Sequence, residues 1–545
     1  MLAGTSAVNG VAPSAAWIRR PNNPGQSPGN GLIAYTQGGR AWWSYSLNWS
    51  ATSPTWTPTS SASSNALLRW PGPDNLCDVY ANASECGGSG DTWAQLGRYN
   101  YAAKAVATGL DDVAAIVATG GYGEDDSDVL IVTSVDAGQT FTRSLLLSIP
   151  SSSGLDTGFA VDPESVHASV AQVGENNTPR AGAVAQPIYV TWRATDAFNA
   201  SSWWFTRVLV GASGTVAEVM RPRRLEFVPA VPGTHVSIFG YRIVGRERIG
   251  VAWSERDSGA STECDDDPAA TTNVSWYASQ TDTFGDAWDC FDGAFHLYPG
   301  PLSDFVGCDT VQRRTEIMQE KEWKLCVGPG ESARRARNTD RPEVAMNMAA
   351  FALDGSQEDE ERKGWYFAVT KRSDTSGSGM RVCIYGTGYV TNGALEYFKE
   401  LYCSPDTDPQ GGGSVTDAWA PALAVMQGSG TVPFVNAGDE HLIGMVHRAG
   451  FSNGTRTMAT TAQSQSNTYT EARLTVDGTG VPNAWEGDAG LQLGLAVYQP
   501  CELGIAGCPQ SGSFAYPSIP FLATWPDTRP TNTFGNVIYA RRFTW

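Results

Sequence analysis

Short apolar runs recur along the whole chain, separated by stretches rich in Gly, Pro, Ser and Asp. Runs of this length between turn-forming residues predict β-strands rather than helices. An apolar strand that ends in a small residue and often an aromatic residue recurs seven times, some copies matching loosely: GLIAYT (31–36), AAIVAT (114–119), PIYVTW (187–192), RIGVAW (248–253), WYFAVT (365–370), HLIGMV (441–446) and PFLATW (520–525).

Most copies have a second apolar segment before them and a third after a polar hairpin. Preceding segments are SVHASVA (165–171), RPEVAM (341–346), APALAVM (420–426) and LQLGLAVY (491–498), and following ones are VLIVTS (129–134), VSWYAS (274–279), RVCIYG (381–386) and NVIYAR (536–541). Dividing 545 residues by seven gives about 78 per unit, enough for a four-stranded antiparallel blade with its loops.

The repeat therefore predicts an all-β fold, a single seven-bladed β-propeller of four-stranded antiparallel blades covering residues 1–545. The blades are expected at about 10–71, 98–150, 164–222, 234–302, 341–403, 419–476 and 490–545, the last with an N-terminal strand added. An insertion at 303–340 carries the one helix-like charged stretch, so we expect it to be partly helical and to cover the ligand face or a blade edge.

A second motif follows the third strand of the second unit, where Ser134–Phe141 read SVDAGQTF. Its Ser hydroxyl and Asp carboxylate are suited to accept backbone N–H groups in a tight turn, Gly to take a positive φ, and Phe to plug the gap between strands. Looser relatives are TDTFGDAWD (281–289), with one extra residue, TVDGTGVPNAW (475–485) and SLNWSATSPTW (46–56).

SVDAGQTF resembles the Asp-box pattern S-x-D-x-G-x-[TS]-[WF] of the sialidase-like (Asp-box, or BNR-repeat) β-propeller superfamily. The resemblance implies the propeller fold, with Asp boxes at one end of the disc and ligand-binding hairpins at the other. A sialidase of this superfamily needs an R-I-P arginine and a Tyr–Glu couple. The first blade reads WIRRP instead, so no catalytic residue is assigned.

The formal net charge of −19 argues against a nucleic-acid partner, because phosphate binding needs a cationic surface. No apolar run is long enough to span a membrane. Residues 1–10 lack a basic segment followed by an apolar one, so we expect that any signal peptide has been removed.

Ten cysteines without a C-x-x-C pair favour disulfides and an extracellular or cell-surface location. Three close couples are Cys77 with Cys86, Cys383 with Cys403 and Cys501 with Cys508. The pairing of the remaining four stays open: Cys264, Cys290, Cys308 and Cys326. Reduced buried thiols are the alternative.

In five units of this acidic protein an arginine follows the repeated second strand: Arg193, Arg256, Arg372, Arg448 and Arg529. Arg337 of the insertion would add a further positive charge to this group. Converging guanidinium groups suit a carboxylate, sulfate or phosphate ligand. Alternatively, each arginine pairs with an acid of its own hairpin, such as Asp196 or Asp257, and only staples the turn.

Acidic and histidine residues give weaker candidates. In the hairpin EDDSD, Asp125, Asp126 and Asp128 are candidate ligands for a structural calcium ion; the alternative is that the hairpin is a solvated acidic turn. We expect that no cofactor is required. A polysaccharide lyase would use His and Tyr for proton abstraction, for which His167, His235 and His447 with Tyr241 are candidates. The alternative is that these residues serve packing and hydrogen bonding.

Three functions remain open. The preferred one is a recognition propeller that binds an anionic glycan or a surface protein partner. The second is a glycoside hydrolase or polysaccharide lyase acting on a charged carbohydrate, so enzymatic activity is undecided. The third is a structural surface-layer component, favoured if the rim arginines are all internally paired.

Overall fold

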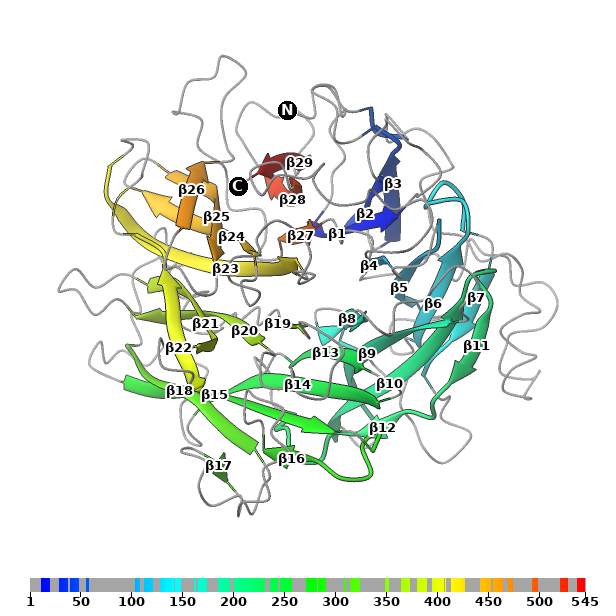
Figure 1. Ribbon diagram of the computed structural model, residues 1–545, viewed down its shortest axis with the longest axis horizontal. Coiled ribbons are helices and arrows are strands. Elements are labelled where there is room, and N and C mark those ends of the chain that lie inside the picture. Colours follow the sequence, from blue (N-terminus) through cyan, green and yellow to red (C-terminus); the bar gives the residue numbers. More distant parts are fainter. Residues whose placement is uncertain are drawn as a thin grey trace. The chain divides into compact units, whose positions relative to one another are not determined.

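The fold is seen in a computed structural model that describes the strands and their tighter connections (Figure 1). The described residues are 11–19, 29–37, 40–48, 55–57, 103–107, 112–120, 128–141, 143–148, 161–162, 165–173, 185–196, 200–230, 236–243, 246–256, 271–281, 283–290, 308–309, 314–323, 348–351, 364–372, 380–389, 395–405, 407, 413–426, 442–451, 454–463, 469–473, 493–497, 520–527 and 537–544. In these ranges the regular structure is β-strand, and no α-helix occurs. The all-β prediction is confirmed for them.

The chain forms two compact units, each assembled from segments that are distant in sequence. Unit 1 comprises Met1–Ala171, Asn177–Ala230 and Gln492–Trp545; unit 2 comprises Gln172–Asn176 and Val231–Leu491. Closure of both units into one ring, the number of seven blades and the predicted blade boundaries stay predictions.

Unit 1 contains four sets of consecutive antiparallel strands among its described residues. They are β1 (Val11–Arg19), β2 (Gly29–Gln37) and β3 (Arg40–Ser46); β4 (Ala103–Ala107), β5 (Ala114–Gly120), β6 (Asp128–Ser134) and β7 (Arg143–Leu146); β8 (His167–Val173), β9 (Ala185–Thr195), β10 (Ser201–Gly211) and β11 (Val216–Val219), with β12 (Arg223–Arg224) also on β10; and β27 (Gly494–Val497), β28 (Pro520–Asp527) and β29 (Val537–Thr544).

Unit 2 contains three such sets in the part that the structure describes. They are β13 (Val236–Ile243), β14 (Arg246–Arg256), β15 (Thr271–Thr281) and β18 (Arg314–Trp323), with β16 (Asp289–Cys290) on β15 and β17 (Cys308–Asp309) on β18; β19 (Met348–Phe351), β20 (Gly364–Arg372), β21 (Met380–Tyr389) and β22 (Leu395–Cys403); and β23 (Val415–Met426), β24 (Leu442–Phe451), β25 (Gly454–Gln463) and β26 (Tyr469–Arg473).

Every copy of the repeated apolar segment falls on a strand. The copies lie on β2, β5, β9, β14, β20, β24 and β28, and each of these strands pairs with neighbours on both sides. A strand with two neighbours in its own sheet and further sheets on its faces needs apolar residues throughout, and this explains why the repeat reads as a continuous apolar run. The predicted second strands are therefore confirmed.

Successive sheets pack face to face through shared apolar clusters. In unit 1 the first sheet packs on the second around Ile18, Leu32 and Ile116, and the second on the third around Val117, Ile188 and Trp192. In unit 2, Tyr366 and Ile384 pack with Leu423 and Met445 of the following sheet. Consecutive four-stranded sheets stacked in this way are the building principle of β-propellers.

The first sheet also packs against the last one. Trp17 and Ile33 share an apolar cluster with Ala496, Leu522 and Ile538, although the two groups lie at opposite ends of the sequence. Strand β1 pairs with β2 and so belongs to the first sheet. The predicted addition of N-terminal residues to the last blade falls on residues 1–10, outside the described residues.

The predicted helical stretch of the 303–340 insertion is wrong where the structure describes it. Residues 314–323 form β18, which pairs with β15 from Thr271↔Trp323 to Ala278↔Thr315. The sequence RTEIMQEKEW has good helix formers, but β15 offers an unpaired edge, and pairing it satisfies a full row of backbone groups. Tertiary pairing thus overrides local helix propensity.

The turn after β6 has the hydrogen bonds that its sequence predicts. Ser134 Oγ accepts from the backbone N–H of Gly138 at 2.9 Å, and Asp136 Oδ1 accepts from that of Thr140 at 2.8 Å. Gly138 has φ +83°, and the Phe141 ring packs edge-on against Trp43 with ring centroids 5.4 Å apart. The motif is therefore a self-contained turn clamped against the neighbouring sheet.

The turn after β15 is built in the same way with threonines. Thr281 Oγ1 accepts from Gly285 N at 3.0 Å, Thr283 Oγ1 accepts from Ala287 N at 2.8 Å, and Gly285 has φ +91°. Thr283 thus takes the place of Asp136. The spacing equals that of SVDAGQTF, and the extra residue that we inferred for TDTFGDAWD is wrong, because a hydroxyl replaces the carboxylate as acceptor.

One predicted disulfide is present. Cys383 on β21 and Cys403 on β22 face each other in the antiparallel ladder and are bonded across a sequence separation of 20. Closing a loop of that size stabilises the fold by roughly 3 kcal/mol in the chain-entropy account. The predicted Cys77–Cys86 and Cys501–Cys508 couples lie outside the described residues.

Candidate functional site

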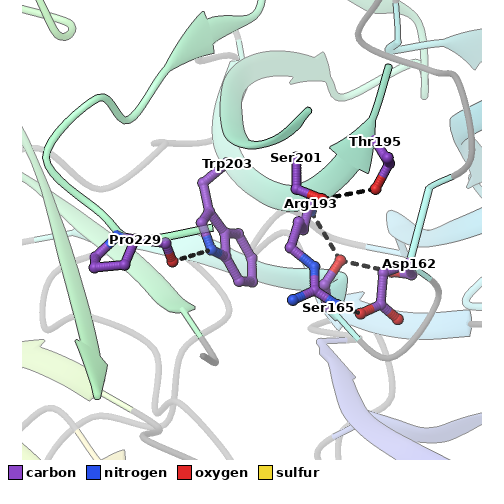
Figure 2. Close-up of polar contacts among 7 residues, drawn as sticks. All are labelled: Asp162, Ser165, Arg193, Thr195, Ser201, Trp203 and Pro229. Atoms are coloured by element: carbon purple, nitrogen blue, oxygen red, sulfur yellow. Dashed lines mark hydrogen bonds and ion pairs between the residues drawn. The ribbon is translucent and has the colours of Figure 1, made fainter. Parts of the chain in front are cut away.

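Arg193 lies near the end of β9, where that strand turns into the hairpin to β10 (Figure 2). Its guanidinium forms an ion pair with Asp162, which lies in the segment leading into β8. The Arg193 side chain is 15% exposed and that of Asp162 31% exposed. The pair is therefore half-buried, with one side open to solvent.

Backbone groups hold the two side chains in place. Ser165 Oγ accepts a hydrogen bond from the Arg193 N–H at 2.8 Å, and the Asp162 N–H donates to the Arg193 carbonyl at 2.9 Å. Because both residues are bonded through their main chains, the guanidinium and the carboxylate are presented from a fixed base. A ligand would find the donors of one beside the acceptors of the other.

Further polar groups surround the pair at this end of the sheet. The hydroxyls of Thr195 and Ser201 are 2.8 Å apart across the hairpin, and the Trp203 indole N–H donates to the Pro229 carbonyl at 3.2 Å (Figure 2). Trp203 lies opposite Arg193 in the β9–β10 ladder and is fully buried, so its ring offers no stacking surface.

The partner of Arg193 is not the acid that the sequence suggested. Asp196 of the same hairpin instead accepts a hydrogen bond from the Ala200 N–H at 2.8 Å through Oδ1. Asp162 lies 31 residues before Arg193, and the antiparallel bridge between Val161 and Ala194 brings it near. The ion pair of Arg193 therefore reaches an acid outside its own hairpin.

The other predicted arginines are placed to different degrees. Arg256 and Arg372 are the last residues of β14 and β20, opposite Val274 and Met380 in the ladders. Arg448 on β24 is only 2% exposed, and its Nη1 donates to Thr457 Oγ1 at 2.9 Å. Arg529 and Arg337 lie outside the described residues. Arg256 and Arg372 thus end their strands, whereas Arg448 lies inside β24, and convergence on one ligand stays a prediction.

A second buried arginine on the neighbouring strand, Arg456, was missed by sequence reasoning. Arg456 on β25 is 1% exposed, and its guanidinium carbon lies 4.4 Å from the centroid of the Phe451 ring. His447, also 2% exposed, has its pKa lowered to about 4 by burial, so the ring is neutral at physiological pH. The segment TRTMATT has no regular alternation of polar and apolar residues, so the burial of Arg456 leaves no signal in the sequence.

The remaining candidates gain little support. His167 is half-buried at the start of β8, Tyr241 lies on β13 opposite Arg248, and His235 lies outside the described residues. Asp128 opens β6 opposite Gly120, whereas Asp125 and Asp126 lie outside them. Within the described ranges, no group of three or more His, Cys, Asp or Glu side chains is arranged to hold a metal ion. The calcium site stays a prediction.

No curated protein and no protein-family profile matches the chain. Among solved structures it is similar to the subtype N11 neuraminidase-like protein of A/flat-faced bat/Peru/033/2010 (H18N11), with 8% identity, TM-score 0.32 and coverage of 85% of this chain and 91% of the other. It is also similar to the catalytic domain of the Coprinopsis cinerea GH62 α-L-arabinofuranosidase, with 9% identity, TM-score 0.28 and coverage of 69% of this chain and 94% of the other. The xylan β-1,4-xylosidase of Bacillus halodurans C-125 has 10% identity and TM-score 0.25, with coverage of 99% of this chain and 91% of the other. Similarities this low carry no argument about chemistry, which rests on the residues described above.

Proposed function

We propose that the protein is an extracellular recognition protein that binds an anionic glycan through arginines at the ends of its sheets. The observation that supports this most directly is Arg193, whose main chain is fixed by Ser165 and Asp162 and whose guanidinium remains partly open to solvent. A glycan carboxylate or sulfate would accept two parallel hydrogen bonds from it. The adjoining carboxylate of Asp162 would accept hydrogen bonds from sugar hydroxyls.

The extracellular location rests on chemistry rather than on a targeting signal. The Cys383–Cys403 bond requires an oxidising compartment to persist. Among the described residues, no helix is both long and apolar enough to cross a bilayer. A net charge of −19 makes a locally cationic end of a sheet selective, because anions are repelled elsewhere on the surface.

A structural surface protein is the second candidate, and one observation favours it. Arg193 and Arg448 both have internal partners, as arginines that only hold the sheets together would have. A hydrolase or lyase acting on a charged carbohydrate has no comparable support, since the candidate base His447 is buried to 2% exposure.

The test is a binding screen of the full chain against sialylated, uronate-containing and sulfated glycans, scored for binding and for product release. Arg193→Gln should weaken the best anionic ligand by about tenfold, equivalent to one charge-assisted contact. Asp162→Asn should strengthen it, because the competing carboxylate is removed while the shape is kept. Unchanged affinity in both variants, together with a lower thermal stability than wild type, would favour the structural role, and released product would favour the enzyme.

A further inference from the structure

The outer edge of the third sheet in unit 1 carries a dense group of arginines. Strands β11 and β12 both pair with β10, in the registers Val208↔Val219 and Trp204↔Arg224. The stretch between them is fixed to β10 at both ends, since Met220 N donates to the Arg207 carbonyl and Leu225 N to that of Trp203, each at 2.9 Å. We call Arg221–Arg224, with the sequence RPRR, the arginine edge.

Two of its three arginines are exposed and carry unneutralised charge. Arg221 and Arg224 are exposed, and their side chains make no hydrogen bond or ion pair with the described residues, while Arg223 is half-buried. The neighbouring acid Glu218 has Arg207 as its ion-pair partner, at 3.7 Å, and its side chain is 62% exposed. The side chains of Arg221 and Arg224 therefore keep a positive charge with which an anion can pair.

The arrangement is linear rather than concave. Arg223 and Arg224 are consecutive strand residues, so they project to opposite faces of the sheet. Arg221 precedes them in the sequence and is separated from Arg223 by Pro222. Small anions bind best where several donors converge on one point. Charges set out along a rigid edge match a polymer whose oxyanions repeat along its length.

We propose that the arginine edge binds a linear anionic polysaccharide, by its repeated sulfate or carboxylate groups. The inference goes beyond the proposed function, because the arginine edge lies on the other side of β10 from Arg193 and shares no residue with the Arg193–Asp162 pair. The ordinary alternative is that Pro222 and its charged neighbours only prevent the edge from pairing with another sheet. The two roles lead to different results when charge is removed.

The experiment measures binding of the full chain to a sulfated polysaccharide and to a polyuronate over a range of salt concentrations. In Arg221→Gln/Arg224→Gln, affinity for whichever polymer binds wild type should fall at least about tenfold. The slope of log K against log salt should become shallower by about two, since two charges no longer displace counterions. Arg221→Lys/Arg224→Lys is the matched control and should stay within about threefold, because charge is retained.

Several results would overturn the proposal. The first is that wild type binds neither polymer, and the second is that the Gln variant binds as well as wild type. The third is that the Gln variant binds normally but self-associates in sedimentation, which is the result that edge protection predicts. Wild-type dimers that the Gln variant abolishes would assign the edge to an acidic second copy instead. Arg193→Gln, measured in parallel, distinguishes failure here from failure of the proposed function.

Discussion

The indole N–H of Trp43 donates a hydrogen bond to the carbonyl oxygen of Gly138, and the two atoms lie 3.1 Å apart. Trp43 belongs to β3 of the first sheet, and Gly138 to the turn after β6 of the second. Asn30 makes an equivalent bond from Nδ2 to the Ala137 carbonyl at 3.2 Å. Side chains of one sheet thus satisfy the carbonyl groups of the next sheet's turn, so this motif joins sheets as well as closing a hairpin.

Gly138 is the residue on which this junction depends most. Its φ of +83° is costly for other residues, and a Cβ there would lie 2.9 Å from Ile18 Cδ1 and 3.3 Å from Leu32 Cδ1. We expect Gly138→Ala to lower the free energy of unfolding by about 2–3 kcal/mol. Urea denaturation measures it. Gly413→Ala is the control, because φ is +106° there but nothing lies within 4 Å of the new Cβ. Equal losses in both variants would contradict a role for the packing.

The threonine version of the turn gives a second prediction. Thr283→Asp places a carboxylate where Asp136 stands in the other turn, so the Ala287 N–H keeps an acceptor and stability should change by less than about 0.5 kcal/mol. Thr283→Val keeps the shape but removes the acceptor, and should cost about 1–2 kcal/mol. Thermal unfolding of both variants checks this. A larger loss for Asp than for Val would refute the equivalence of the two turns.

The strands could be predicted because burial on both faces leaves a continuous apolar run in each repeated segment, as in PIYVTW on β9. Three features could not. Thr283 was missed because the turn selects an acceptor rather than a residue type, and Asp162 because its approach to Arg193 depends on strand pairing across 31 residues. Residues 314–323 were misread because helix propensity is local, whereas the open edge of β15 is not.

Contact between the first and last sheets of unit 1 can be tested at Gly494. A Cβ on this β27 residue would lie 2.8 Å from the Ala15 backbone nitrogen, 3.0 Å from Ser14 Cα and 2.3 Å from Thr524 Oγ1. Backbone atoms of β1 cannot move aside as a side chain can. We expect Gly494→Ala to cost more than about 2 kcal/mol in urea unfolding, within the upper range for overpacking.

Thr524→Ala separates the two sources of that cost. It removes the hydroxyl contact but leaves both β1 backbone contacts in place, so Gly494→Ala/Thr524→Ala should remain destabilised by more than half as much as Gly494→Ala. Full recovery in the double variant would mean that the side chain alone was responsible. The close approach of β27 to β1 would then be refuted.

His447 makes stability depend on pH. Burial lowers its pKa from 6.5 to about 4, so between these values the unfolded chain binds a proton that the folded chain does not. Stability is therefore complete above about pH 6.5 and falls as the pH drops towards 4, by roughly 3 kcal/mol. His447→Gln removes this titration, so its unfolding free energy should fall less steeply over the same range. Parallel pH profiles for wild type and His447→Gln would show that the buried ring is not the source of the dependence.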